Sequence, residues 1–355
     1  MLRDQTRHIK VGPVALGGGA PVSVQSMCNT KTWDAETTLA QINALAAAGC
    51  DIVRLAVPDE KSALALRAIC ARSPLPVVAD IHFDYRLALL AAEAGVAKLR
   101  INPGNIGGED RVRAVAEACI KRGIPIRIGV NAGSLEKPLL ERFGGPTAEA
   151  LVESAAGHAA LLERYGFTDI CISIKSSDVA RTVEANRLAA RRFPYPLHLG
   201  VTEAGTAFQG TVNSAVGIGA LLMEGIGDTI RVSLTADPVE EVRAGIAILK
   251  ACGLRRSGVR VVSCPTCGRT EIDLIATAER VEAALRDCER DITVAVMGCA
   301  VNGPGEAREA DYGLAGGRGE ALLFRRGQIV RKVPAPEMVE ALLGLIAEED
   351  KGERE

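Results

Sequence analysis

The feature that most constrains the fold of this chain is a regular alternation of short β-rich runs with alanine-rich helical segments. Eight such runs occur before residue 252, and segments between them, such as 37–48, 86–94 and 110–121, have helical periodicity. The runs are 21–28, 52–57, 76–83, 98–103, 126–133, 170–177, 197–205 and 229–235. Eight strand–helix units within about 250 residues are typical of a closed (β/α)8, or TIM, barrel, and a doubly wound open sheet is the main alternative.

The end of this repeat marks a domain boundary. Asp237 can cap the eighth helix, Pro238 fits its first position, and Glu240 and Glu241 suit the positive end of its dipole. The polar run 254–258 follows, so we expect a barrel domain over residues 1–253 and a small α+β domain over residues 259–355. In the second domain the pattern predicts strands at 259–263 and 292–298, helices at 271–287 and 336–348, and a hairpin at 321–333.

Composition argues against several functions. Apolar residues make up 48% of the 355 residues and aromatic residues only 3%, so the core is expected to be large and aliphatic. A net charge of −2 gives no argument for nucleic-acid binding, and no apolar run has the length of a membrane span. The N-terminus has no apolar signal core, and ten cysteines in so long a chain do not indicate a disulfide scaffold. We therefore expect a cytoplasmic protein.

The ends of the predicted strands carry the strongest functional signal. In a barrel, active sites form at the carboxyl ends of the strands, and here strand after strand ends in polar residues. Five of them are basic: Arg54, Arg100, Arg127, Lys175 and Arg231. Clustered like charges and the planar guanidinium fork indicate a phosphorylated, and more specifically a diphosphorylated, small molecule as ligand. Asp80, His82, His198 and Glu203 would supply acid–base or hydroxyl-binding groups. The other polar residues at these strand ends are Asn102, Asn131, Ser173, Thr202 and Ser233.

Three cysteines of the second domain form a framework of metal ligands. Cys264 and Cys267 lie two residues apart, and Cys299 follows a second predicted strand in a loop rich in Gly and Pro that ends at Glu306. Three thiolates and one weaker ligand favour an iron–sulfur cluster with Glu306 as the fourth ligand. Zinc remains an alternative, although Cys288 is the only further cysteine nearby and every histidine lies in the barrel domain. A zinc-dependent hydrolase or aldolase, and a metal-dependent sensor, are thus the competing functions.

The chain also resembles a known family in long motifs that occur in the family's order. The resemblance is to the 4-hydroxy-3-methylbut-2-enyl diphosphate synthases of the methylerythritol phosphate route to isoprenoids, in their two-domain bacterial form. The motifs are Pro21-Val-Ser-Val-Gln-Ser-Met27, Ala79-Asp-Ile-His-Phe83, Leu99-Arg-Ile-Asn-Pro-Gly-Asn-Ile-Gly107, Ile128-Gly-Val-Asn-Ala-Gly-Ser134, His198-Leu-Gly-Val-Thr-Glu-Ala-Gly205, Cys264-Pro-Thr-Cys-Gly-Arg269 and Gly298-Cys-Ala-Val-Asn-Gly-Pro-Gly-Glu306. They extend over nearly the whole chain.

The resemblance implies a mechanism and a set of residues for it. It implies a [4Fe-4S] cluster on Cys264, Cys267 and Cys299 with Glu306 as an exchangeable ligand, and reductive opening of 2-C-methyl-D-erythritol 2,4-cyclodiphosphate. The diphosphate-binding residues would be Arg54, Arg100, Arg127, Lys175, Arg231 and Ser233. His82, Asn131 and Glu203 would lie near the reacting carbons with Asp80 beside them, and Glu203 would deliver a proton or bind a hydroxyl. Electrons would come from a ferredoxin or a flavodoxin.

The length of the linker predicts an oligomer. Barrel helices lead away from the catalytic face, so the helix at 238–251 ends at the opposite face of the barrel. The linker 253–258 spans at most about 20 Å, too little to carry the second domain back to the rim of its own barrel. We therefore expect a head-to-tail homodimer in which each cluster serves the barrel of the other subunit, and the resemblance implies the same arrangement.

Overall fold

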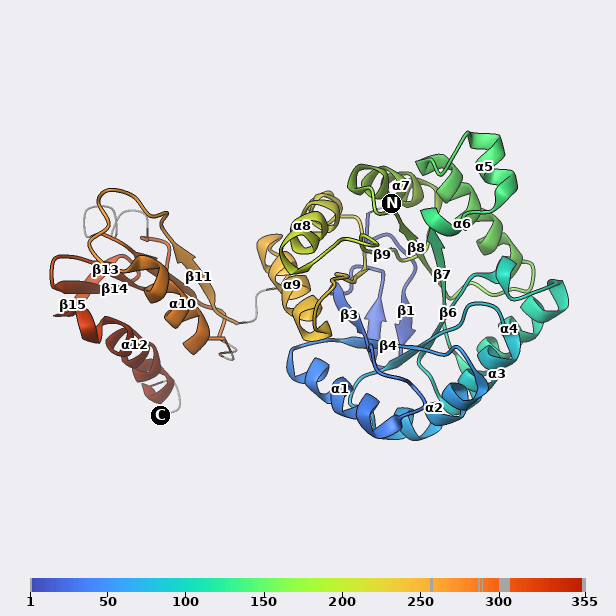
Figure 1. Ribbon diagram of the computed structural model, residues 1–355, viewed down its shortest axis with the longest axis horizontal. Coiled ribbons are helices and arrows are strands. Elements are labelled where there is room, and N and C mark those ends of the chain that lie inside the picture. The colour runs from blue at the N-terminus through green and yellow to red at the C-terminus, as the bar shows by residue number, and fades with distance from the viewer. Residues whose placement is uncertain (1, 256–257, 287, 289, 300–306, 353–355) are drawn as a thin grey trace. The chain divides into compact units, whose positions relative to one another are not determined.

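The computed structural model describes residues 2–255, 258–286, 288, 290–299 and 307–352. Contacts between residues divide the chain into two compact units, with the division after Arg255 (Figure 1). Among the residues described, none of the helices combines the length and the apolar character that crossing a bilayer would require.

Eight parallel strands form the sheet of the first unit, in the order β8-β7-β6-β5-β4-β3-β10-β9. A parallel bridge between Ile172 and Leu197 joins β8 to the segment that enters β9, so the sheet closes on itself. The predicted (β/α)8 barrel is therefore confirmed and the open sheet is excluded. The strands are β3 (Ser23–Met27), β4 (Ile52–Ala56), β5 (Val77–Asp80), β6 (Lys98–Ile101), β7 (Ile126–Asn131), β8 (Ile170–Lys175), β9 (His198–Leu199) and β10 (Thr229–Ile230).

Helices surround these strands on the outside of the barrel (Figure 1). They are α1 (Ala35–Ala47), α2 (Glu60–Arg72), α3 (Tyr85–Ala94), α4 (Glu109–Arg122), α5 (Lys137–Phe143), α6 (Ala148–Glu163), α7 (Val179–Arg192), α8 (Ala207–Met223) and α9 (Pro238–Ala251). Most begin at a capping side chain that accepts a hydrogen bond from a backbone N–H of the first turn, which satisfies one of the donors left free there. The capping residues are Asp34, Asp59, Asp84, Thr147, Asp178 and Asp237.

The last two strands are much shorter than the runs predicted at 197–205 and 229–235. The chain departs from the ladder at Gly200, where a Cβ atom would lie 2.6 Å from both the Arg231 carbonyl oxygen and Lys175 Nζ. Glu203 then adopts a left-handed backbone conformation with φ of 52°. These segments therefore turn toward the barrel mouth instead of continuing as strands.

A short antiparallel hairpin, β1 (Ile9–Val11) and β2 (Val14–Leu16), precedes the barrel. Its buried residues pack on side chains near the starts of three barrel strands, and the whole cluster consists of Ile9, Val11, Leu16, Ile52, Val78 and Cys171. The hairpin therefore covers the end of the barrel opposite the carboxyl ends of the strands.

A buried carboxylate ties the N-terminal segment to the same end of the barrel. Asp228 accepts hydrogen bonds from the backbone N–H of Leu197 at 2.7 Å and from the Thr6 hydroxyl at 2.9 Å. The Thr6 hydroxyl also lies 2.9 Å from the Arg3 carbonyl oxygen. Burial raises the pKa of Asp228 to about 6 despite these hydrogen bonds, because the charged form is poorly solvated there.

The second unit has one mixed sheet in the order β11-β12-β13-β14-β15. Its strands are β11 (Arg260–Ser263), β12 (Thr293–Met297), β13 (Tyr312–Gly316), β14 (Glu320–Arg325) and β15 (Gln328–Pro334), and its helices are α10 (Leu274–Ala284) and α12 (Met338–Gly352). The first three strands are parallel and the last three antiparallel. Leu274, Val281 and Leu342 of the helices pack with Val294 and Leu323 of the sheet in one core.

The sequence pattern did not predict β13, whose glycines are untypical of a strand. Gly313 is required there by packing, since a Cβ atom would lie 2.3 Å from the ring of Phe324 on the neighbouring strand. The hairpin predicted at 321–333 is present as β14 and β15, and it turns at Arg326 and Gly327, both with positive φ.

Asp228→Asn should stabilise the first unit at neutral pH. The folded-state pKa of about 6 exceeds the ordinary value of 3.8, so the wild type loses stability as the pH rises from about 4 to about 6. An asparagine can still accept from Leu197 and donate to Thr6 without this loss, which amounts to at most about 3 kcal/mol. Urea unfolding at pH 4.5 and pH 7.5 should show a clearly larger gain for the variant at the higher pH.

Asp4→Asn is the matched control, since Asp4 is an exposed carboxylate of the same N-terminal segment. It should leave the free energy of unfolding unchanged at both pH values. An equal gain for Asp228→Asn at pH 4.5 and pH 7.5 would show that its buried charge is not the cause.

Candidate active site

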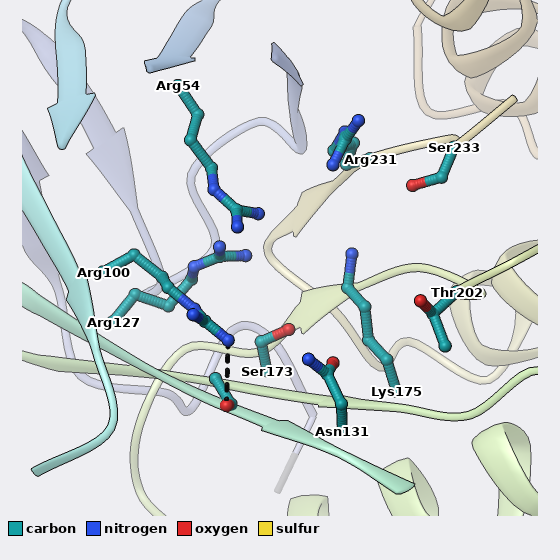
Figure 2. A pocket seen from close by; sticks show the side chains of 10 residues that line it. Arg54, Arg100, Arg127, Asn131, Ser173, Lys175, Thr202, Arg231 and Ser233 are labelled. Carbon is teal, nitrogen blue, oxygen red and sulfur yellow. Dashed lines mark hydrogen bonds between the residues drawn. The ribbon is translucent and has the colours of Figure 1, made fainter. Parts of the chain in front are cut away.

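A pocket lies inside the barrel at the carboxyl ends of the strands (Figure 2). Side chains of a strand alternate between its two faces, so every second residue of β7 and β8 points inward. The lining residues are Arg54, Arg100, Arg127, Gly129, Asn131, Ser173, Lys175, Thr202, Arg231 and Ser233. The structure thus brings together six predicted phosphate-binding residues and Asn131 in one cavity.

The pocket is strongly cationic. Five of its side chains are basic, and in Figure 2 their charged ends point toward a common space. Arg127, Arg100 and Lys175 are 1%, 4% and 7% exposed, and none of the described residues that line the pocket is an acid. Burial, followed by the charges of Arg127 and Arg231, holds the pKa of Lys175 well below its usual range. A ligand with several negative charges would relieve this repulsion.

Asp80 lies behind the pocket and pairs with two of its arginines. Its carboxylate is 2.5 Å from Arg54 Nη2, 3.3 Å from Arg100 Nη1 and 3.2 Å from His82 Nε2. Burial alone would raise the pKa of Asp80, but the Arg54 charge, the His82 hydrogen bond and the Arg100 charge together hold it well below its usual range. Asp80 is therefore an ionised counter-charge at working pH and is not suited to donate a proton.

Two glycines on inward-facing positions make space for the cationic side chains. A Cβ atom at Gly129 would lie 2.5 Å from Arg100 Nε, and one at Gly200 would lie 2.6 Å from Lys175 Nζ. The guanidinium of Arg100 also donates to the Gly129 carbonyl oxygen at 3.2 Å (Figure 2). Sequence reasoning did not assign a role to either glycine. Each lies two residues from an inward-facing polar residue of the same run, and this alternation was a usable signal.

The remaining predicted groups occupy different environments. His82 is half exposed beside Asp80 and Arg100, and Glu203 is exposed on the loop that follows β9. His198, expected at the rim, is instead fully buried in the first position of β9 and does not line the pocket. The prediction for His198 was wrong because His198 is the first residue of the short strand β9. Its side chain therefore lies deeper in the barrel than the mouth of the pocket.

Two of the three predicted ligand cysteines, all in the second unit, lie close to each other at one end of its sheet. Cys264 directly follows β11 and Cys299 follows β12, and these strands are parallel neighbours in register. The backbone N–H of Gly298 donates to Cys264 Sγ at 3.2 Å. Such N–H···S bonds are typical of thiolates that hold iron–sulfur clusters.

Cys267 lies in a tight turn just beyond Cys264. Its backbone N–H donates to Thr270 Oγ1 at 3.2 Å, and the Thr270 N–H donates to the Cys267 carbonyl oxygen at 3.0 Å. A backbone N–H of Arg269 lowers the pKa of the exposed Cys267 thiol. These soft donors suit an iron–sulfur cluster. Within the described part of the chain, no three His, Cys, Asp or Glu side chains are placed to hold a metal ion. Glu306 lies outside the described residues.

Comparisons with known proteins agree with this architecture. The model of the GcpE TIM-barrel domain matches residues 6–246, and the model of the GcpE protein C-terminal domain matches residues 260–348. The chain belongs to the GcpE family. Two curated relatives bear the name 4-hydroxy-3-methylbut-2-en-1-yl diphosphate synthase (flavodoxin). That of Geobacter sulfurreducens is 63% identical over 96% of this chain and 97% of its own, and that of Bacillus subtilis is 57% identical over 98% and 93%.

A solved structure shares the barrel fold at much lower identity. Dihydropteroate synthase from Xanthomonas albilineans is 13% identical, covers 69% of this chain and 98% of its own, and superposes with a TM-score of 0.50. At this identity the likeness concerns the fold of the barrel alone.

Lys175→Met should stabilise this GcpE-family barrel while weakening anion binding. The change removes one buried cation from a cluster of like charges and keeps the side-chain volume, so a gain of roughly 1–3 kcal/mol in unfolding free energy is expected. Inorganic pyrophosphate should raise the melting temperature of the wild type by mass action and raise that of the variant much less. Thermal unfolding with and without pyrophosphate measures both effects.

Lys98→Met is the matched control. Lys98 is also fully buried in the barrel, and burial lowers its pKa to about 8, but it does not line the pocket. This variant should gain stability and still respond to pyrophosphate. A Lys175→Met protein that pyrophosphate stabilises as strongly as the wild type would contradict the assignment of the pocket.

Proposed function

We propose that the barrel pocket binds 2-C-methyl-D-erythritol 2,4-cyclodiphosphate and that the chain converts it to 4-hydroxy-3-methylbut-2-enyl diphosphate. The activity is that of the synthases to which its curated relatives belong, an oxidoreductase reaction of isoprenoid precursor biosynthesis. In this reaction the ring C–O bond to phosphate breaks, two electrons and one proton enter, and a hydroxyl group leaves as water.

The observation that carries this proposal is the convergence of five basic side chains on one buried pocket. Arg54, Arg100, Arg127 and Arg231 offer planar donor pairs that match phosphate oxygens, and Lys175 adds a compact charge. Ser173, Thr202 and Ser233 add hydroxyl groups to the lining, and in Figure 2 Thr202 and Ser233 lie across the pocket from Arg54 and Arg100. The leaving diphosphate gains negative charge as the C–O bond breaks, so these donors stabilise the transition state more than the substrate.

Proton delivery requires a group that can hold a proton at working pH. Asp80 is unsuited because Arg54 and Arg100 keep it ionised, and we assign it the task of fixing those two side chains. Glu203, on the loop after β9, is the proposed proton donor or hydroxyl ligand, and its neighbour Thr202 lines the pocket. His82 and Asn131 complete the surroundings of the reacting carbons.

Electrons require a redox group, and the family consists of iron–sulfur enzymes. We assign a [4Fe-4S] cluster to Cys264, Cys267 and Cys299, with Glu306 as the exchangeable fourth ligand. When bound, such a cluster supplies electrons one at a time to a substrate that reaches its open position. The chain's own contribution is the Gly298 N–H, which donates to Cys264 Sγ, and the turn at Thr270, which holds the backbone of Cys267.

A flavodoxin is the proposed electron donor, since the curated relatives carry that word in their names, and a ferredoxin is the alternative. Both donors and the reduced thiolates fit a cytoplasmic location, which we also propose. These donors are acidic one-electron carriers and would act at the second unit, where the cluster is assigned.

We further propose a head-to-tail homodimer. Arg255, the last described residue of the first unit, is held to Asp51 by an ion pair at 3.5 Å and to the Gly49 carbonyl oxygen by a hydrogen bond at 3.4 Å. Both partners precede β4, so they lie at the end of the barrel opposite the pocket. Only a few residues separate Arg255 from β11, which leaves little chain to return to the same barrel's mouth.

Cys264→Ala should abolish the cluster. Removal of one of three thiolates leaves the site without enough ligands, so protein purified without oxygen should contain almost no iron or sulfide and should not turn over. Glu306→Ala should keep most of its iron but lose most turnover. Iron and sulfide analysis, with an assay of cyclodiphosphate reduction using reduced flavodoxin, measures both.

Cys288→Ala is the control within the same unit, because Cys288 packs against the hydrophobic core. It should keep wild-type iron content and activity. Normal iron in Cys264→Ala, or loss of iron in Cys288→Ala, would overturn the ligand assignment.

The dimer can be tested by mixing two inactive subunits. In a purified heterodimer of Cys264→Ala and Lys175→Met chains, the intact cluster of one subunit would face the intact pocket of the other, so about half of the wild-type turnover should return. An inactive heterodimer would show that each cluster serves its own barrel, and a monomeric wild type at micromolar concentration would exclude the dimer.

A further inference from the structure

Glu241 is a buried acid next to the pocket that does not line it. It belongs to the first turn of α9, where sequence reasoning assigned it to the helix dipole, but it is only 4% exposed. Its neighbour Glu240 has the exposed environment expected of a helix start and pairs with Arg243 one turn later. The two adjacent glutamates thus have different surroundings, and only Glu241 faces the interior of the barrel.

Both carboxylate oxygens of Glu241 are occupied by donors from other segments. Arg231 Nη2 lies 3.3 Å from each oxygen, and Arg231 Nε lies 3.4 Å from Oε2. The backbone N–H of Leu234 donates to Oε1 at 3.0 Å, and the hydroxyl of Ser26 donates to Oε2 at 3.1 Å. One side chain therefore joins α9 to β3, to the pocket arginine, and to the loop that carries Ser233.

We propose that Glu241 is a positioning residue that holds Arg231 and the Ser233 loop in the geometry with which the pocket binds a diphosphate. This inference rests on the proposed function of the pocket. Glu241 acts through Arg231 and does not itself touch the ligand. Glu241 would hold Arg231 on the β10 side of the pocket in the same way that Asp80 holds Arg54 and Arg100.

The physical reason is the crowding of like charges around Arg231. Arg54 and Lys175 line the same pocket, and their charges would drive a freely rotating guanidinium away from the centre. Among the residues that the structure describes, the other hydrogen-bond partner of Arg231 is Met27 Sδ at 3.7 Å, which is too weak an acceptor to fix it. A two-point contact with Glu241 limits the rotamers of Arg231 before any ligand arrives, so less entropy is lost on binding.

A simpler possibility is that Glu241 serves only as a counter-charge. Two substitutions separate the alternatives, because Glu241→Asp keeps the charge but shortens the reach, while Glu241→Gln keeps the reach but removes the charge. A counter-charge alone predicts unchanged binding in the aspartate variant and tighter anion binding in the glutamine variant. Positioning predicts weaker binding in the aspartate variant and a smaller loss in the glutamine variant.

The experiment is a double-mutant cycle with inorganic pyrophosphate as the probe, measured by isothermal titration calorimetry on the full-length chain. Glu241→Asp should weaken binding roughly tenfold in the wild-type background, because the Arg231 contact is lost. In an Arg231→Met background the same change should alter binding by less than about twofold. Glu240→Asp should have no effect in either background.

Three results would count against the inference. Equal losses from Glu241→Asp in both backgrounds would mean that Glu241 does not act through Arg231. If Glu241→Asp left the pyrophosphate affinity unchanged but lowered the unfolding temperature, Glu241 would have a structural role only. A wild type that does not bind pyrophosphate at all would instead reject the pocket assignment, which distinguishes failure of the proposed function from failure of this inference alone.

Discussion

Repulsion among five buried or partly buried basic side chains is the constraint on which the rest of the barrel depends. Arg54, Arg100, Arg127, Lys175 and Arg231 share one pocket, and burial makes every uncompensated charge costly. The free protein offsets this cost with two buried acids placed outside the pocket, Asp80 and Glu241. The pocket itself stays cationic, so the larger part of the compensation is left to the ligand.

This division of charge explains features of the fold that packing alone does not. β9 and β10 are only two residues long, and beyond them the chain bends so that Arg231 and Ser233 reach the cavity. Gly129 and Gly200 have no side chain at the positions where Arg100 and Lys175 occupy the space. The aliphatic core between strands and helices supplies the stability that such a polar interior lacks.

The sequence was sufficient to count eight strand–helix units, because the strand runs and helix signals are local and agree with one another. It left the open sheet as an alternative, since closure depends on the long-range bridge between Ile172 and Leu197. It was also sufficient to name the basic residues of the pocket, because strand ends of a barrel meet at one face. The sequence did not predict that His198 lies below the mouth of the pocket or that Glu241 is buried against the sheet, because neither position depends on a local pattern. Those positions follow from where short strands end and from which helix face packs on β3, which only the tertiary structure determines.

The pairing of β10 with β3 has a consequence for how the chain is made. Thr229 lies opposite Ser23, and the Asp228–Thr6 hydrogen bond joins residues 222 positions apart. The barrel therefore cannot close until the ribosome has synthesised β10. Until then β3 has an unpaired edge. Contacts of such long range form slowly, and open edges invite association with other nascent chains. A truncated product that ends before residue 229 is thus a natural substrate for chaperones and proteases.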